Sequence, residues 1–128
     1  MNHVLYVKDD EMLRNLAWGI LTAMGHTVET VGTAEEALAW CSDAANEIGS
    51  VIIDLNSSRI GHGIELAGQI ACIRPDAAIT ALSGGIRSLP AGMPATVRLL
   101  PKPMSVQRLH EAAQATAASA IENPCRAW

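Results

Sequence analysis

Five short aliphatic runs, separated by segments of helical periodicity, constrain the fold more than any other feature of this chain. The first run is short, apolar and bounded by charged residues, which is typical of a strand buried on both faces, and the run at residues 27–31 is β-branched and alternating, which also predicts a strand. We expect strands at residues 4–7, 27–31, 50–54, 78–82 and 96–100. Strands that alternate with helices form a parallel sheet with right-handed crossovers and helices on both faces. The predicted fold class is therefore α/β, with a doubly wound, five-stranded parallel sheet.

The segments between the runs have the spacing and the boundary residues of helices. Thr33 and Glu36 form a capping box that predicts the start of the second helix. The third helix is expected over residues 64–73 and a last helix from Ser105 to Ile121. The segment between them from Gly84 to Pro94 is too rich in Gly and Pro for a long helix. The first helix should end at Gly25, and the stripe that it buries is expected to be Leu13, Leu16, Ala17, Ile20 and Met24. The stripe of the second helix is expected to be Ala34, Ala37, Leu38, Cys41 and Ala45.

The length of 128 residues fits one domain, which we place at residues 1–122, followed by a tail at 123–128. The net charge is −4 and no basic run occurs, which argues against direct binding of DNA or of an anionic membrane surface. No apolar run reaches the roughly 20 residues of a membrane span, and the first apolar stretch is too short for a signal peptide. We therefore expect a cytoplasmic protein.

The cysteines and histidines show no metal-binding or disulfide pattern. Cys41, Cys72 and Cys125 are odd in number and far apart, and we expect the first two to be small packing residues on helices. The four histidines lack the spacing of a metal site. Trp18 and Trp40 lie beside the expected helical stripes and should be partly buried packing residues.

Polar side chains gather where the expected strands end. Sites in open α/β sheets form beyond the carboxyl ends of the strands, so these residues should lie at one edge of the sheet. They are Lys8, Asp9 and Asp10 after the first strand, Asp54 at the end of the third, Ser83 after the fourth and Lys102 after the fifth. Acids, a hydroxyl group and an ammonium group at one edge predict a functional site there.

These motifs, in this order, resemble the receiver domains of two-component response regulators. The resemblance extends from Val4 to about Ile121 and includes the acidic turn after the first strand, the strand that ends in Asp54 and the start of the third helix. It also includes the Ser83-Gly84 and Lys102-Pro103 motifs. The resemblance implies the flavodoxin-like (βα)5 receiver fold.

The same resemblance implies a role for each polar residue. Asp54 would be the phosphoacceptor, and it would take a phosphoryl group from phosphohistidine as a nucleophile. Mg²⁺ would be held by Asp9, Asp54 and the main-chain carbonyl of Asn56. Ser83 and Lys102 would contact phosphoryl oxygens, and Pro103 would hold Lys102 in place. Such a domain is a signalling module and not an enzyme in the ordinary sense. Its partners would be a sensor histidine kinase or a histidine phosphotransfer protein, and a downstream protein target.

Lys8 departs from the family pattern, because it stands at the first of two positions where the family has paired acids. Asp9 and Asp54 contribute −2 and Lys8 and Lys102 contribute +2, so the expected pocket is neutral without any metal. In one arrangement Lys8 competes with Mg²⁺ and weakens the metal site. In the other, Lys8 points into solvent and Asp10 is the second acid, which requires a one-residue shift. The ungapped register favours the first arrangement.

Three further departures concern the output of the signal. The loop at residues 57–62 is about one residue longer than usual, and Arg59 or His62 either reaches the phosphoryl site or belongs to a solvated loop tip. Leu99 occupies the position of the family's aromatic switch residue. The segment from Gly84 to Pro94 is short, which predicts a reduced fourth helix in the family's numbering.

Two functions remain open at this point. The first is an active phosphoacceptor, which the presence of Asp54, Ser83 and Lys102 favours. The second is an atypical receiver that acts as a protein-interaction module, which Lys8 favours. A flavodoxin-like enzyme or a nucleotide-binding protein has no support, because neither a glycine fingerprint nor a Walker loop occurs.

Overall fold

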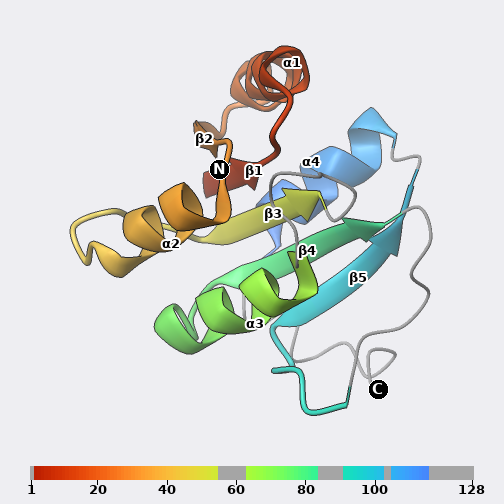
Figure 1. The fold of residues 1–128 in the computed structure, drawn as a ribbon. Helices are drawn as coiled ribbons and strands as arrows, with labels where there is room; N and C mark the ends of the chain where they lie inside the picture. Colours follow the sequence, from red (N-terminus) through yellow and green to blue (C-terminus); the bar gives the residue numbers. More distant parts are fainter. Residues whose placement is uncertain (1, 55–62, 84–90, 103–104, 116–128) are drawn as a thin grey trace.

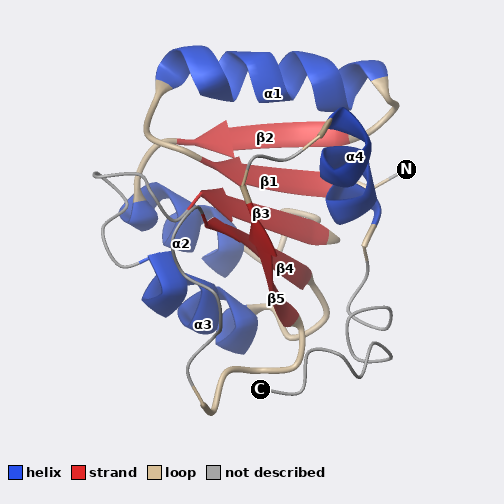
Figure 2. Cartoon of the chain, turned by 90° about the vertical axis from the view of Figure 1, so that its right-hand side faces the viewer, coloured by secondary structure: helices blue, strands red, loops and turns tan. Residues whose placement is uncertain are grey.

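The computed structural model describes residues 2–54, 63–83, 91–102 and 105–115, and within them the chain forms one parallel sheet with helices on both faces (Figure 1). The strands lie in the order β2-β1-β3-β4-β5, as Figure 2 shows. Their bounds are β1 His3–Val7, β2 Thr27–Val31, β3 Ser50–Asp54, β4 Ala78–Ser83 and β5 Val97–Pro101. The helices are α1 Glu11–Ala23, α2 Ala34–Ser42, α3 Gly63–Ile73 and α4 Val106–Gln114. The predicted fold class is confirmed.

The core has two layers because successive side chains of each strand point to opposite faces of the sheet. Leu5, Val51 and Ile53 face α2 and α3, where they pack with buried residues such as Ala37 and Ile70. Val4, Tyr6 and Ile52 face α1 and α4, where they pack with residues such as Leu21 and Ala112. All five residues of β3 are buried, as expected for the central strand of a doubly wound sheet.

Side-chain caps fix where three of the helices begin. Asp10 caps α1 by accepting a hydrogen bond from the Leu13 N–H, and Ser105 caps α4 through the Arg108 N–H. Thr33 accepts from the Glu36 N–H at the start of α2, which confirms the capping box. After α1, Gly25 adopts a φ of +98°, a left-handed conformation in which glycine avoids the steric cost of a side chain.

The predicted buried stripe of α1 is wrong in part. Leu13 and Leu16 are exposed, whereas Leu21, which was not in that stripe, is fully buried together with Ala17. Trp18 was expected to be partly buried and is 49% exposed, and Trp40 packs against the α2–α3 core. The helix therefore packs closely through a narrow face centred on Ala17 and Leu21.

Three smaller predictions are also corrected. Ala45 lies beyond the end of α2 and is exposed, and Cys72 is exposed although Cys41 is buried. The last helix ends at Gln114, because Ala115 has extended backbone angles. The predicted continuation to Ile121, the tail at 123–128 and the first part of the Gly84–Pro94 segment lie outside the described residues.

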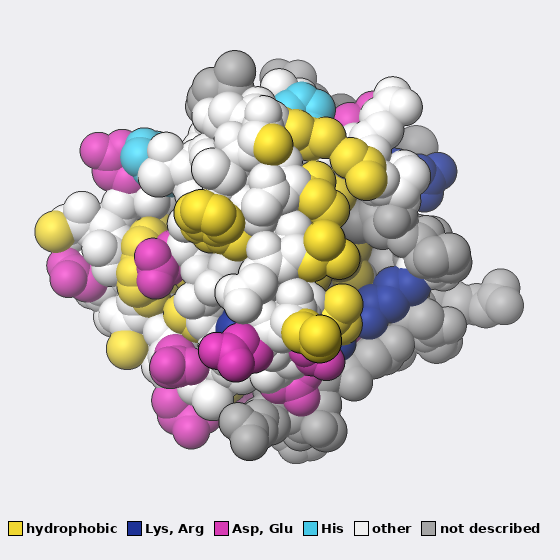
Figure 3. Space-filling view, turned by 90° about the horizontal axis from the view of Figure 1, so that it is seen from above, with side chains coloured by type: hydrophobic (Ala, Val, Ile, Leu, Met, Phe, Trp, Pro, Cys, Tyr) yellow, Lys and Arg dark blue, Asp and Glu magenta, His cyan; other side chains and the backbone are white. Residues whose placement is uncertain are grey.

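Apolar side chains form a band along α1, which is prominent in the space-filling view from above (Figure 3). The large apolar residues of α1 that are exposed are Met12, Leu13, Leu16 and Trp18, and Val106 of α4 is exposed as well. No helix among the described residues combines the length and the apolar character needed to cross a membrane.

Candidate functional site

The candidate site lies at the carboxyl ends of β1, β3, β4 and β5. The register pairs Tyr6 with Ile52 and Val7 with Ile53, so the next position along β1, Lys8, falls beside Asp54. Lys8 also has the same strand parity as Tyr6, which places both on the side of the sheet that Asp54 faces. On the other side of β3, Ser83 closes β4, and the Lys102 N–H donates to the Ser83 carbonyl at 2.9 Å.

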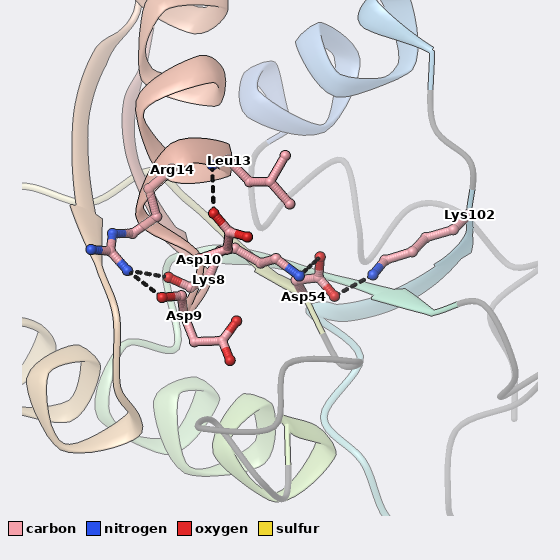
Figure 4. A network of polar contacts seen from close by, with 7 residues as sticks. All are labelled: Lys8, Asp9, Asp10, Leu13, Arg14, Asp54 and Lys102. Carbon is pink, nitrogen blue, oxygen red and sulfur yellow. Dashed lines mark hydrogen bonds and ion pairs between the residues drawn. The ribbon is translucent and has the colours of Figure 1, made fainter.

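Two lysine side chains bracket the Asp54 carboxylate, one at each oxygen (Figure 4). The Lys8 Nζ lies 3.1 Å from Asp54 Oδ2, and the Lys102 Nζ donates to Asp54 Oδ1. The Asp54 side chain is 8% exposed and that of Lys8 is 12% exposed, so this ion pair is largely screened from water by protein. Lys8 therefore points into the site and not into solvent.

The turn between β1 and α1 is held by Arg14, a residue that the sequence did not single out. The Arg14 guanidinium donates from Nη1 to the carbonyls of Lys8 and Asp9, at 2.8 and 2.9 Å. The guanidinium lies so close to Gly32 that a Cβ there would be 2.7 Å from Arg14 Nη1. Glycine at position 32 thus makes room for the side chain that fixes the direction of Lys8.

Asp10 and Asp9 have separate roles in this turn. The Asp10 carboxylate caps α1, with Oδ1 3.2 Å from the Leu13 nitrogen, and the residue is exposed. Asp9 is half-buried and takes part in a polar interaction of its own, as do Asp54 and Ser83. The arrangement in which Asp10 replaces Lys8 as the second acid therefore requires the loss of a helix cap and of the Lys8–Asp54 ion pair.

The described residues fit a divalent cation poorly. No group of three or more His, Cys, Asp or Glu side chains that could hold a metal ion exists among the described residues. One oxygen of Asp54 already faces the Lys8 ammonium, and a cation at that oxygen would meet a like charge. The carbonyl of Asn56, expected as a further ligand, lies outside the described residues. Magnesium binding at Asp9 and Asp54 stays a prediction that this geometry disfavours.

Tyr6 lies on the same side of the sheet as Asp54, one strand away. Burial is the main cause that raises the pKa of Tyr6 to about 12, and the negative charge of Asp54 adds to it. Since Tyr6 is the only tyrosine of the chain, its phenol is a natural probe of the charge at the site.

The remaining predicted site features divide between described and undescribed residues. Ser83 is buried at the end of β4, one residue beyond Leu82, which pairs with Asp54. Leu99 packs against the α2–α3 core, on the face of the sheet away from α4. The loop at residues 57–62, with Arg59 and His62, and Pro103 lie outside the described residues.

Two histidines far apart in sequence meet away from this site. The Nε2 of buried His26 lies 2.9 Å from the Nδ1 of His110 on α4. The backbone N–H of Asn2 donates to His26 Nδ1 at 3.3 Å, so the proton of neutral His26 is on Nε2, and it is donated to His110. This pair could not be predicted from the sequence pattern, because the two residues are 84 positions apart.

Comparison with known proteins gives consistent results. No family model matches the chain. The curated protein described as DNA-binding transcriptional regulator NtrC, from Azospirillum brasilense, is 28% identical over 109 residues. The match covers 83% of this chain but only 22% of that protein, so the chain spans about a fifth of this relative's length.

Solved structures match over most of the chain. A response regulator receiver domain protein from Clostridium thermocellum has a TM-score of 0.73 and 23% identity, and the match covers 94% of each chain. A chain from the crystal structure of the histidine kinase ThkA in complex with the response regulator TrrA has a TM-score of 0.69 and 26% identity. That match covers 87% of this chain and 94% of the other.

Proposed function

Since the chain is a receiver domain of the response-regulator type, we propose that Asp54 accepts a phosphoryl group in a two-component relay. The observation that carries the proposal is the Asp54 carboxylate at the end of β3, held between two ammonium groups. Transfer of a phosphoryl group depends mainly on positioning and on neutralising the charge of its oxygens. A carboxylate flanked by Lys8 and Lys102 supplies the acceptor and the cations together.

The reaction is a displacement at phosphorus. An oxygen of Asp54 attacks the phosphorus of a phosphohistidine, the new O–P bond forms, and the P–N bond breaks with its electron pair going to the imidazole nitrogen, which takes up a proton from solvent. The product is an acyl phosphate on Asp54 and a neutral histidine on the donor. We assign contacts with the new phosphoryl oxygens to Lys102, which already pairs with Asp54, and to Ser83, which ends the neighbouring strand.

The proposed donor is a sensor histidine kinase or a histidine phosphotransfer protein, and the proposed acceptor of the signal is another protein. Support for a kinase partner comes from the matched structure of ThkA in complex with TrrA. The apolar side chains exposed on α1 begin at Met12, two residues after Asp10, and we place protein docking there. The absence of direct DNA binding and the cytoplasmic location stay predictions.

Incubation with acetyl phosphate, followed by intact mass measurement, tests the proposal. We expect one added phosphoryl mass, assigned to Asp54 by fragmentation of the protein's peptides. Asp54→Asn should abolish the adduct, and circular dichroism should establish that this variant is folded. An adduct at another residue, or no adduct under any buffer condition, would refute the proposal.

A second candidate function is a protein-interaction module that phosphate does not regulate. The ion pair between Lys8 and Asp54 favours it, because both oxygens of the acceptor carboxylate already have cationic partners. This function predicts no phosphoryl adduct with acetyl phosphate, whether or not magnesium is present. The same mass measurement therefore separates the two functions.

A further inference from the structure

The chain contains only two lysines, Lys8 and Lys102, among 128 residues, and both pair with the same carboxylate. Its other cationic residues are arginines, apart from histidine. A lysine ammonium is a compact point charge with three donors, which suits it to an anionic centre where several oxygens must be contacted in turn. The two lysines bracket Asp54 from strands on opposite sides of β3, as Figure 4 shows.

We propose that the Lys8 ammonium takes the place of a divalent cation at Asp54, so that Asp54 is phosphorylated without any metal. This inference rests on the proposed function, since it names the cation that supports the same reaction. Lys8 contacts the carboxylate that reacts, and it is on this view a catalytic residue. The following observations carry it.

Lys8 is held in the site by the fold. The sheet register sets its side chain next to Asp54, and Arg14 fixes the two carbonyls that precede α1. The side chain is 12% exposed, whereas exposed lysines extend into water. An ion pair this well buried persists only when its charges are compensated, and here the Asp54 carboxylate faces both lysine ammonium groups, one at each oxygen.

The charge of the site already balances. Asp9 and Asp54 contribute −2 and the two lysines contribute +2, which leaves a neutral pocket. A divalent cation would bring this sum to +2 and would face the Lys8 ammonium at close range. A phosphoryl group on Asp54 changes the charge of that side chain from −1 to −2. Asp9, the phosphorylated Asp54 and the two lysines then sum to −1 without any metal ion.

The chemistry needs no further reactant than the phosphoryl donor. With acetyl phosphate, an Asp54 oxygen forms a bond to phosphorus, the P–O bond to the acetyl group breaks, and its electron pair leaves on acetate. Each lysine then moves from a carboxylate oxygen to a phosphoryl oxygen, a shift that the flexible four-carbon side chain allows. Both cations therefore stay paired throughout the transfer.

Three variants of the full chain test the role of Lys8. Each is incubated with acetyl phosphate in EDTA and, separately, with Mg²⁺, and the adduct is followed by intact mass. For the native chain we expect equal rates in the two buffers. Lys8→Met, which keeps the length of the side chain without its charge, should react about 100-fold more slowly in both. Lys8→Asp should react only with Mg²⁺. Arg108→Met removes an exposed cation of α4 and should react like the native chain.

A direct binding measurement gives a second readout that does not depend on reactivity. Mn²⁺ broadens the amide NMR signals of residues close to its binding site. We expect no selective broadening at Lys8 or Asp54 in the native chain, and strong broadening there in Lys8→Asp. Selective broadening in the native chain at millimolar Mn²⁺ would overturn the inference.

The outcomes separate this inference from the proposed function. Adduct formation that requires Mg²⁺ in the native chain overturns the role of Lys8 and leaves Asp54 as the acceptor. An adduct in Lys8→Asp with Mg²⁺ but none in the native chain also overturns it, because Lys8 would then block the reaction. The absence of an adduct in every folded variant and buffer refutes the proposed function, and the inference falls with it.

Discussion

At the scale of single residues, the convergence of Asp54, Ser83 and Lys102 at one edge of the sheet follows from the order of the strands. Each residue stands at the end of an aliphatic run, and parallel strands end at the same edge. The sequence left two arrangements of Lys8 open and favoured the one with Lys8 in the site. The register between β1 and β3 decides between them, because it shows that position 8 continues the row of Tyr6, next to Asp54.

Tyr6 gives a prediction at this scale. Burial first and the charge of Asp54 second raise the pKa of Tyr6 to about 12, from 10.0. Because the pKa is higher in the folded state, the contribution of Tyr6 to stability is complete below pH 10 and is lost as the pH rises towards 12. We expect an ultraviolet absorbance titration of the native chain to show this late ionisation.

The variant Asp54→Asn tests the smaller of the two causes that raise the Tyr6 pKa, which is the negative charge of Asp54. Removal of the carboxylate charge should lower the pKa of Tyr6, and burial should still keep it above 10.0. The Tyr6 pKa in Asp54→Asn therefore measures the effect of the Asp54 charge, provided that the circular dichroism spectrum of this variant is native. An unchanged Tyr6 pKa in Asp54→Asn would contradict the electrostatic coupling between the two residues.

At the scale of elements, strands were easier to predict than the faces of helices. The bounds expected for β2 and β3 match those observed, because their β-branched runs leave few alternatives. The buried face of α1 was misjudged at Leu13 and Leu16, since large apolar residues cover most of the surface of that helix and hydrophobicity alone does not choose among them. The choice comes from close packing of Ala17 and Leu21 on the sheet.

The contact between α4 and the start of β2 gives a prediction at this scale. Burial, then His110, then the positive amino terminus lower the pKa of His26. A folded-state pKa below the ordinary value means that the unfolded chain binds this proton more readily. The contribution of neutral His26 to stability is therefore complete above a pH of about 6.5 and is lost as the pH falls below it.

Urea unfolding as a function of pH measures this effect. We expect the free energy of unfolding to fall between about pH 7 and pH 5, with a slope for one proton of at most about 1.4 kcal/mol per pH unit. His26→Gln should remove that part of the slope. His3→Gln is the matched control, because His3 is an exposed residue paired with Glu47. Equal slopes in the native chain and in His26→Gln would exclude His26 as the source.

At the scale of the whole molecule, the central strands join two cores that are otherwise separate. In β3, Ile52 packs on the α1–α4 side and Ile53 on the α2–α3 side, and both side chains are fully buried. A residue removed from one side therefore disturbs the strand that supports the other. We expect the domain to unfold as one cooperative unit, as most small domains do.

The pair Ile52→Val and Ile53→Val tests this cooperativity with the same chemical change on opposite faces. Each should lower the free energy of unfolding by about 0.5–1.5 kcal/mol, because one buried methylene is lost.

Native-state hydrogen exchange at the amides of Leu21 in α1 and Ile70 in α3 reports on the two cores, since both residues are fully buried. In a single cooperative unit, either substitution lowers the exchange free energy at both amides by the same amount. If Ile53→Val affected only Ile70, and Ile52→Val only Leu21, the two faces would unfold independently and the sheet would not couple them. The arrangement of β3, with all five residues buried between the helix layers, argues for coupling: neither layer can lose its support without exposing the strand that ends in Asp54.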